Sequence, residues 1–140
     1  MVPRGYAAVR QYREADVSSL VAEASPHRLI AMLYDGALER LAIAESGMNR
    51  GNVADKLRGI DSAMAIFAHL RNVLDYEAGG VIARRLDSLY DYMMRRLLRA
   101  KLDGDIAGVR EVAALLRTVK AGWDAIAPGA LAPPGRAFAA

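Results

Sequence analysis

Cysteine is absent from the 140-residue chain, and histidine occurs only as His27 and His69. Without cysteine the protein has no disulfides, no thiolate metal ligands and no cysteine nucleophile. Di-metal centres in helical bundles use Glu-x-x-His pairs, but neither histidine has a glutamate three residues before it. We therefore expect no metal site and no cofactor.

Long apolar runs are missing as well. No stretch approaches the roughly 18 apolar residues of a membrane span, and the first residues, MVPRGY, lack the apolar core of a signal peptide. The composition, 54% hydrophobic and 25% charged, is that of one globular domain. We expect a cytoplasmic (cytosolic) protein with no membrane partner.

Positive charge is present in only small excess. The formal net charge is +3, and 16 of the 19 cationic side chains are arginines interleaved with acids. The densest arginine cluster also contains two acids and comprises Arg84, Arg85, Asp87, Asp91, Arg95, Arg96 and Arg99. No recognition helix and no stacking platform of aromatic residues accompanies it, so we expect no nucleic-acid partner.

Few residue pairs could carry out chemistry. Ser25 and His27 lie close in sequence, but a nucleophile needs a base held by a third group near an oxyanion site. A helix that starts at Pro26 explains both residues through capping geometry. Asp35 and Asp91 each follow a tyrosine without any phosphate-binding glycine loop, so we interpret them as helix-surface acids beside arginines. The sequence indicates that the protein is not an enzyme.

Apolar residues recur at three- and four-residue steps in four long stretches that short, turn-rich segments connect. Ser25, Asn52 and Asp105 are expected as N-caps, and Pro128 follows the last stretch. The expected helices cover residues 26–48, 53–74, 82–100 and 106–126. Since no strand pattern occurs, the predicted fold class is all-α, an antiparallel up-down four-helix bundle.

The chain is expected to divide into three parts. Residues 1–24 form an N-terminal tail with a short helix over residues 13–22. Residues 25–127 form the bundle. Residues 128–140 have no periodic pattern and are rich in Pro, Gly and Ala, so we expect a disordered C-terminal tail.

The first and third long helices carry more apolar residues than one core face needs. In the first, the expected core stripe is Ile30, Leu33, Ala37, Leu41 and Ala44. Further apolar residues flank these stripes: Leu29, Met32, Tyr34 and Leu38 on the first helix, and Tyr90, Met94 and Leu98 on the third. An exposed apolar patch of this size needs a cover, which can be the N-terminal segment, a second copy or another protein. Gly36, within the first helix, is expected to mark the close approach of another backbone.

An internal similarity relates the two halves of the chain. The pattern L-Y-D-x-x-x-x-R-L occurs at residues 33–41 and again at residues 89–97. The same offset maps Phe67 onto Trp123 and Ile60 onto Leu116. Two related helical hairpins would explain this similarity, and chance resemblance between amphipathic helices is the alternative.

Four segments carry a resemblance to a known family. They read ASPHRLIAMLYDGA at 24–37, LDYEAGGVIA at 74–83, LYDYMMRRLLRA at 89–100, and EVAALL with AGWDAI at 111–126. In these segments, and in their order, the sequence resembles the FliS family of flagellar export chaperones. The resemblance extends from about Tyr6 to Ile126, and Lys101 departs from it where the family usually has Asn.

The resemblance implies a function. Members of this family bind the disordered C-terminal segment of flagellin in a hydrophobic groove and prevent premature polymerisation before type III export. It also implies that the N-terminal tail covers part of the groove, with Tyr6 and Tyr12 in the matching positions. We expect a monomer without client, and whether the flagellar export gate is a second partner is left open. The competing hypothesis is a structural homo-oligomer that buries the same apolar flanks between copies.

Overall fold

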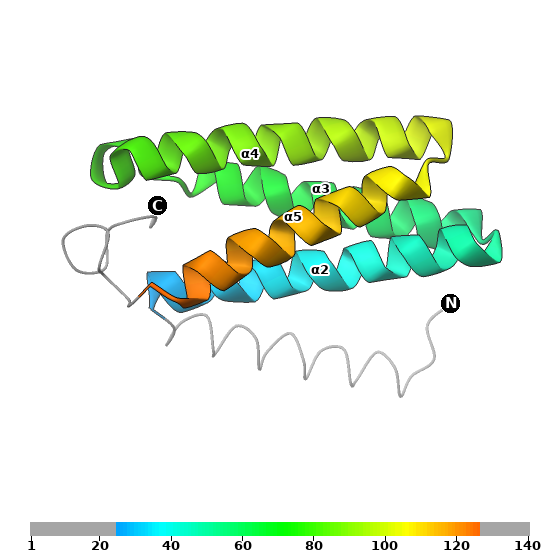
Figure 1. Ribbon diagram of the computed structural model, residues 1–140, viewed down its shortest axis with the longest axis horizontal. Coiled ribbons are helices and arrows are strands. Elements are labelled where there is room, and N and C mark those ends of the chain that lie inside the picture. Colours follow the sequence, from blue (N-terminus) through cyan, green and yellow to red (C-terminus); the bar gives the residue numbers. More distant parts are fainter. Residues whose placement is uncertain (1–24, 127–140) are drawn as a thin grey trace, which may run out of the picture.

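The computed structural model describes residues 25–126, which form four helices and contain no strand. The helices are α2 (Pro26–Arg50), α3 (Val53–Asn72), α4 (Tyr76–Asp103) and α5 (Ile106–Asp124). They run alternately up and down, and each packs against two neighbours in a ring, α2–α3–α4–α5 (Figure 1). The predicted all-α four-helix bundle is confirmed. The expected helix over residues 13–22 and the tail 128–140 lie outside the described residues.

Side-chain caps begin all four helices. The predicted caps Ser25, Asn52 and Asp105 each accept a hydrogen bond from a backbone N–H of the first turn, and so does Asp75 before α4. His27 does not cap. Its Nε2 lies 2.6 Å from the backbone oxygen of Trp123, and its ring stacks on the indole at 4.9 Å. The capping interpretation is therefore correct for Ser25 and wrong for His27, which joins the start of α2 to the end of α5.

The α3–α4 connection is shorter than the sequence suggested. We expected residues 75–80 to be a turn, but α4 already begins at Tyr76 because the Asp75 carboxylate accepts from Ala78 N–H. Gly80 then interrupts the helix with φ 53° and ψ −126°, a left-handed conformation that glycine adopts without a steric penalty. Of the expected turn, only Asp75 and Gly80 have non-helical backbone conformations.

Two glycines bring α2 and α3 together, and Gly36 is not one of them. A Cβ on Gly59 would lie 2.5 Å from the backbone nitrogen of Ala44, and one on Gly47 would lie 2.6 Å from that of Lys56. A Cβ on Gly36 would meet only the side chain of Ile66, at 3.6 Å. The expectation for Gly36 was wrong, since close packing requires glycine at the other two positions.

The core stripe of α2 differs from the expected one at a single step. Tyr34 is fully buried, whereas Leu33 is half-buried and packs at the edge of the core. Aromatic side chains from all four helices meet around Tyr34. Its ring lies 6.4 Å from that of Tyr90 and 6.3 Å from that of Trp123, while Phe67 lies 6.2 Å from Tyr90. An aromatic cluster in the core therefore contributes to the packing of all four helices.

Candidate functional site

Tyr34 and Tyr90 belong to the core and not to a surface groove. Their side chains have exposed fractions of 0% and 1%, and their hydroxyls lie 2.6 Å apart. Burial raises the pKa of Tyr34 to about 12 and raises the pKa of Tyr90 further above its ordinary value. The interpretation of both residues as flanking surface residues was wrong. The two hydroxyls form a hydrogen bond with each other, so both rings can be buried without leaving a polar group unsatisfied.

An apolar flank remains on α2 beside α3. Leu29, Met32, Gly36 and Ile43 recur at helical spacing on one side of the helix, and Ile66 of α3 lies beside Gly36. Leu29 and Met32 are half-buried, and Ile43 is 37% exposed. We call these four residues the α2 flank. Gly36 leaves the helix backbone uncovered at the middle of it.

Leu38 lies on the other side of α2, facing α5. Asp35 and Glu45 share that side at three- and seven-residue spacing, and they form ion pairs with Lys120 and Arg110 of α5. Leu38 is half-buried against the core. The structure therefore does not bring Leu38 together with Leu29 and Met32.

Met94 and Leu98 lie on α4. Met94 is half-buried against the core and lines a surface hollow with Ala68 and Arg71 of α3. Leu98, one turn later, is 45% exposed. The predicted binding residues thus divide among three surfaces and the core, and Tyr6 and Tyr12 lie outside the described residues.

The acids considered for chemistry are paired with cations. Asp91 accepts from Arg71 at 3.3 Å and lies 2.9 Å from Arg95, and Asp35 lies 3.5 Å from Lys120. Asp87 also accepts from Arg71, and this contact lowers the pKa of its carboxyl. The interpretation as surface acids beside arginines fits Asp91, whereas the cation beside Asp35 is a lysine. No group of three or more potential metal-ligating side chains occurs in residues 25–126.

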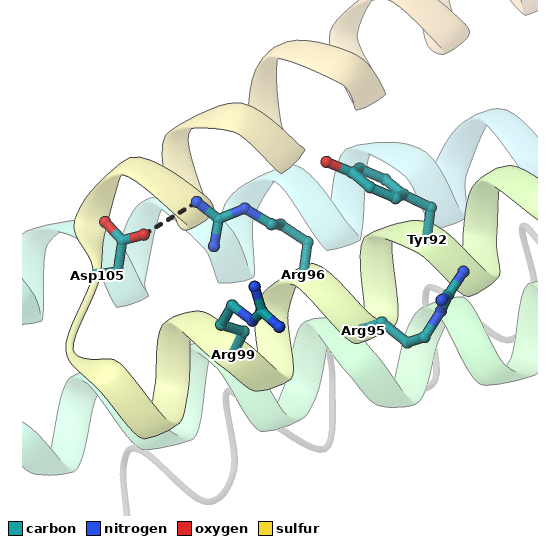
Figure 2. A pocket seen from close by; sticks show the side chains of 5 residues that line it. All are labelled: Tyr92, Arg95, Arg96, Arg99 and Asp105. Atoms are coloured by element: carbon teal, nitrogen blue, oxygen red, sulfur yellow. Dashed lines mark hydrogen bonds and ion pairs between the residues drawn. The ribbon is translucent and has the colours of Figure 1, made fainter.

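An arginine clamp joins α4 to the start of α5. Arg96 donates from Nε to Glu111 and from Nη2 to Asp105, both at 2.9 Å, and Figure 2 shows it reaching across to Asp105. The Tyr92 hydroxyl also donates to Glu111. Hydrogen bonds from Tyr92 and Arg96 lower the pKa of Glu111, and the Arg96 bond lowers that of Asp105. Both carboxylates are thus committed to the clamp.

On the outward face of α4 next to this clamp, sequence reasoning selected only Leu98 as a binding residue. Arg95, Leu98, Arg99 and Leu102 follow one another at positions i, i+3, i+4 and i+7, so they form one strip along the helix. Leu102 is 75% exposed. Its position just before the Asp-Gly-Asp turn could have indicated this exposure. Ile43 was missed in a similar way, since it lies outside the expected core stripe but at helical spacing from Leu29.

The described bundle defines a class of protein. It is an all-α bundle in which the polar side chains considered for catalysis cap a helix, contact Trp123 or pair with cations, while apolar and arginine-rich strips face outward. These features are those of a binding protein. In residues 25–126 no helix is long and apolar enough to cross a membrane.

The chain belongs to the FliS family. A family model described as "Flagellar protein FliS" matches residues 7–130. Flagellar secretion chaperone FliSB of Pseudomonas aeruginosa is 44% identical over 119 residues, which are 85% of this chain and 94% of that protein. Flagellar secretion chaperones FliS of Salmonella typhimurium and Vibrio cholerae are 42% and 36% identical, over 87% and 86% of this chain and 91% and 88% of theirs. The resemblance noted in the sequence is confirmed.

Proposed function

We propose that the protein is a cytosolic flagellar secretion chaperone. In this proposal it binds the disordered C-terminal segment of flagellin and prevents premature polymerisation before type III export. The names of its relatives support the chaperone class. The structural observation that carries the binding mode is the α2 flank, where Leu29, Met32 and Ile43 surround the uncovered backbone at Gly36.

The physical argument starts from the client. A disordered segment loses conformational entropy when it binds, so it must bury a large apolar area to reach useful affinity. The α2 flank offers Leu29 and Met32 on one side of Gly36 and, beyond the exposed Glu39, Ile43 on the other. Because Gly36 has no side chain, a client side chain can approach the helix backbone there beside Ile66. Met94 offers a second apolar contact, on the side of α4 that faces α3. Tyr34 and Tyr90 support the surface from within the core.

The N-terminal tail completes the proposal. We assign Tyr6 and Tyr12 to a lid that covers the groove without client and is displaced by it. The protein is then a monomer when free, and a second partner such as the export gate would contact another face. Deletion of residues 1–12 should raise client affinity or cause self-association, as measured by titration and by size measurements across dilutions. If neither quantity changed, the lid assignment would be wrong.

Met32→Asp is the direct test of the flank. A flagellin C-terminal peptide should bind the wild-type protein with a strongly negative heat-capacity change and weak salt dependence, because apolar burial dominates. A charge at residue 32 should abolish binding in titration calorimetry, while helical content and urea unfolding stay close to wild type, since Met32 lies outside the buried core. Unchanged affinity would exclude the α2 flank as the groove.

Gly36 provides a matched pair of variants. Gly36→Ala adds a Cβ that only touches Ile66 and should leave binding within about threefold, whereas Gly36→Trp should fill the flank and reduce affinity at least about tenfold. Leu38→Asp is not a clean binding test, because Leu38 packs against the core on the α5 side. If the Trp variant bound like the Ala variant, the client would lie elsewhere, with Met94 the next residue to vary.

A further inference from the structure

The outward strip of α4 carries both charge and exposed apolar surface. Arg95, Leu98, Arg99 and Leu102 lie on one side of the helix, and Leu98 and Leu102 are 45% and 75% exposed. We call these four residues the α4 strip. Two hollows border it, one of about 460 Å³ lined by all four residues and Asp103, and one of about 560 Å³ that extends to Tyr92 and Arg96.

No helix of the described bundle covers the α4 strip. On one side of α4, Arg96 reaches to Asp105 and Glu111 of α5. On the other side, Lys101 lies 2.8 Å from Asp61 of α3. The strip lies between these two contacts and faces away from the bundle. In Figure 2 Arg96 contacts Asp105, whereas Arg95 and Arg99 make no contact with it.

The charge of the strip is only partly neutralised locally. Within residues 25–126 Arg99 has no ion pair, although Asp103 lines the same hollow. Arg95 pairs with Asp91 of its own helix at 2.9 Å, and their side chains are 72% and 40% exposed. The nearby carboxylates of Asp105 and Glu111 are already held by Arg96. A guanidinium stays charged at all relevant pH values. Burial of the strip under an apolar surface would therefore desolvate Arg99 without a partner, together with the Arg95–Asp91 pair, which is costly.

Charge complementarity selects the occupant. Residues 127–140 carry Arg136 and no acidic side chain, and residues 1–24 carry three arginines and three acids, so neither terminal segment is acidic. A second copy that used the same strip would set arginines against arginines, because a two-fold contact places the same patch on both sides. We propose that the α4 strip docks an acidic amphipathic helix of another protein. Its carboxylates pair with Arg95 and Arg99, and its apolar side chains pack on Leu98 and Leu102.

The inference is independent of the client proposal. The α2 flank and the α4 strip lie on different helices and differ in chemistry, one apolar around a glycine and the other arginine-rich. Carboxylate pairing makes binding at the α4 strip sensitive to salt, whereas client binding by apolar burial is not. Both ligands can therefore bind the same molecule at once.

The test uses the full-length protein and a synthetic probe. The probe is an amphipathic peptide of about 16 residues, long enough to form a helix on contact, built from Glu, Ala and Leu with Leu at i, i+3, i+4 and i+7. A counterpart has Lys for every Glu. Fluorescence anisotropy should detect the Glu peptide and not the Lys peptide. Amide shift changes on binding should be centred on residues 92–102.

Matched variants make the result decisive. Arg95→Gln with Arg99→Gln should weaken the Glu peptide at least about tenfold, and Leu98→Ala with Leu102→Ala should weaken it severalfold. Arg84→Gln with Arg85→Gln removes the same charge from the same helix about three turns away and should leave affinity unchanged. Equal loss in this control would overturn the proposal, since it would indicate binding by overall charge alone.

A competition experiment separates this inference from the proposed function. A flagellin C-terminal peptide at saturation should leave affinity for the Glu peptide unchanged. Displacement of the Glu peptide would overturn the α4 strip as a distinct site, although client binding would stand. If instead the flagellin peptide did not bind at all and the Glu peptide bound as expected, only the client proposal would fail.

Discussion

The middle of the α2 flank is Gly36, and the position that corresponds to it in the second half of the chain is Tyr92. The offset is that between Tyr34 and Tyr90, the two tyrosines that share a hydrogen bond. At the same offset Ile43 corresponds to Arg99. The α2–α3 hairpin therefore presents apolar residues around an open backbone, where the α4–α5 hairpin presents an aromatic side chain and arginine.

The cores of the two hairpins do not differ in this way. Leu41 and Leu97 are both buried at corresponding positions, as are Ala44 and Ala100. Even the contacts correspond: Tyr34 lies against Trp123 as Tyr90 lies against Phe67. Duplication of one hairpin stays a hypothesis. The comparison teaches that the core fixes which helices meet, whereas surface positions are free to give each half a different ligand chemistry.

The largest expected effect concerns how closely each hairpin is packed. Gly59→Ala would place a Cβ 2.5 Å from the backbone of Ala44, so α2 itself must move, and we expect a loss of about 3 kcal/mol or more in the free energy of unfolding. Gly108→Ala would meet the end of the Arg96 side chain at 2.5 Å and the Cβ of Ala100 at 2.9 Å. Because the nearest group is a side chain that can shift by loosening the clamp, we expect a smaller loss, of about 2 kcal/mol. Urea unfolding measures both losses. The reverse order would contradict a tighter α2–α3 hairpin.

The next effect is alkaline destabilisation through the tyrosine pair that joins the halves. Burial raises the pKa of Tyr34 to about 12 and raises that of Tyr90 as well, so the folded state keeps protons that the unfolded state loses above pH 10. The resulting stability is fully present below pH 10 and is lost as the pH rises toward the folded pKa. Each tyrosine should contribute about 1.4 kcal/mol per pH unit in that range.

Urea unfolding at pH 9, 10 and 11 measures this slope. The double variant Tyr34→Phe with Tyr90→Phe should remove a large part of it. Tyr76 and Tyr92, which are 44% and 41% exposed, should retain a smaller part, because desolvation raises the pKa of Tyr76 and the hydrogen bond to Glu111 raises that of Tyr92. A slope unchanged in the double variant would show that other groups govern alkaline unfolding.

Single substitutions compare the two tyrosines directly. Tyr34→Phe or Tyr90→Phe leaves one buried hydroxyl without a partner, which should cost about 1–3 kcal/mol. If the halves are equivalent, the two losses agree closely, and the double variant costs less than their sum because no unsatisfied hydroxyl remains. A double-mutant cycle by urea unfolding gives all three values. Strictly additive losses would contradict a shared hydrogen bond.

Much of this fold could be predicted from sequence because periodicity and caps are local signals. Ser25, Asn52 and Asp105 were identified as caps by residue type and position. The burial of Tyr34 could not be predicted in this way, because it depends on a partner 56 residues away that satisfies its hydroxyl. For the same reason the predicted binding residues did not form one surface. Apolar flanks can be recognised along one helix, but which neighbour covers each flank is set by tertiary packing.

The smallest expected effect concerns the backbone left uncovered at Gly36. Glycine in a helix interior costs up to about 1 kcal/mol relative to alanine, and a Cβ there makes only ordinary contact with Ile66, at 3.6 Å. Gly36→Ala should therefore raise the free energy of unfolding by about 0.5–1 kcal/mol. Gly122→Ala in α5, with nothing near its Cβ, should show a similar gain and serves as the reference. Gly51→Ala should lose stability instead, because its φ of 69° disfavours a side chain.

Thermal and urea unfolding of the three variants measure these shifts. If Gly36→Ala lost stability while Gly122→Ala gained it, a closer neighbour than Ile66 would cover the α2 flank, and the open backbone that distinguishes this half from the other would not exist.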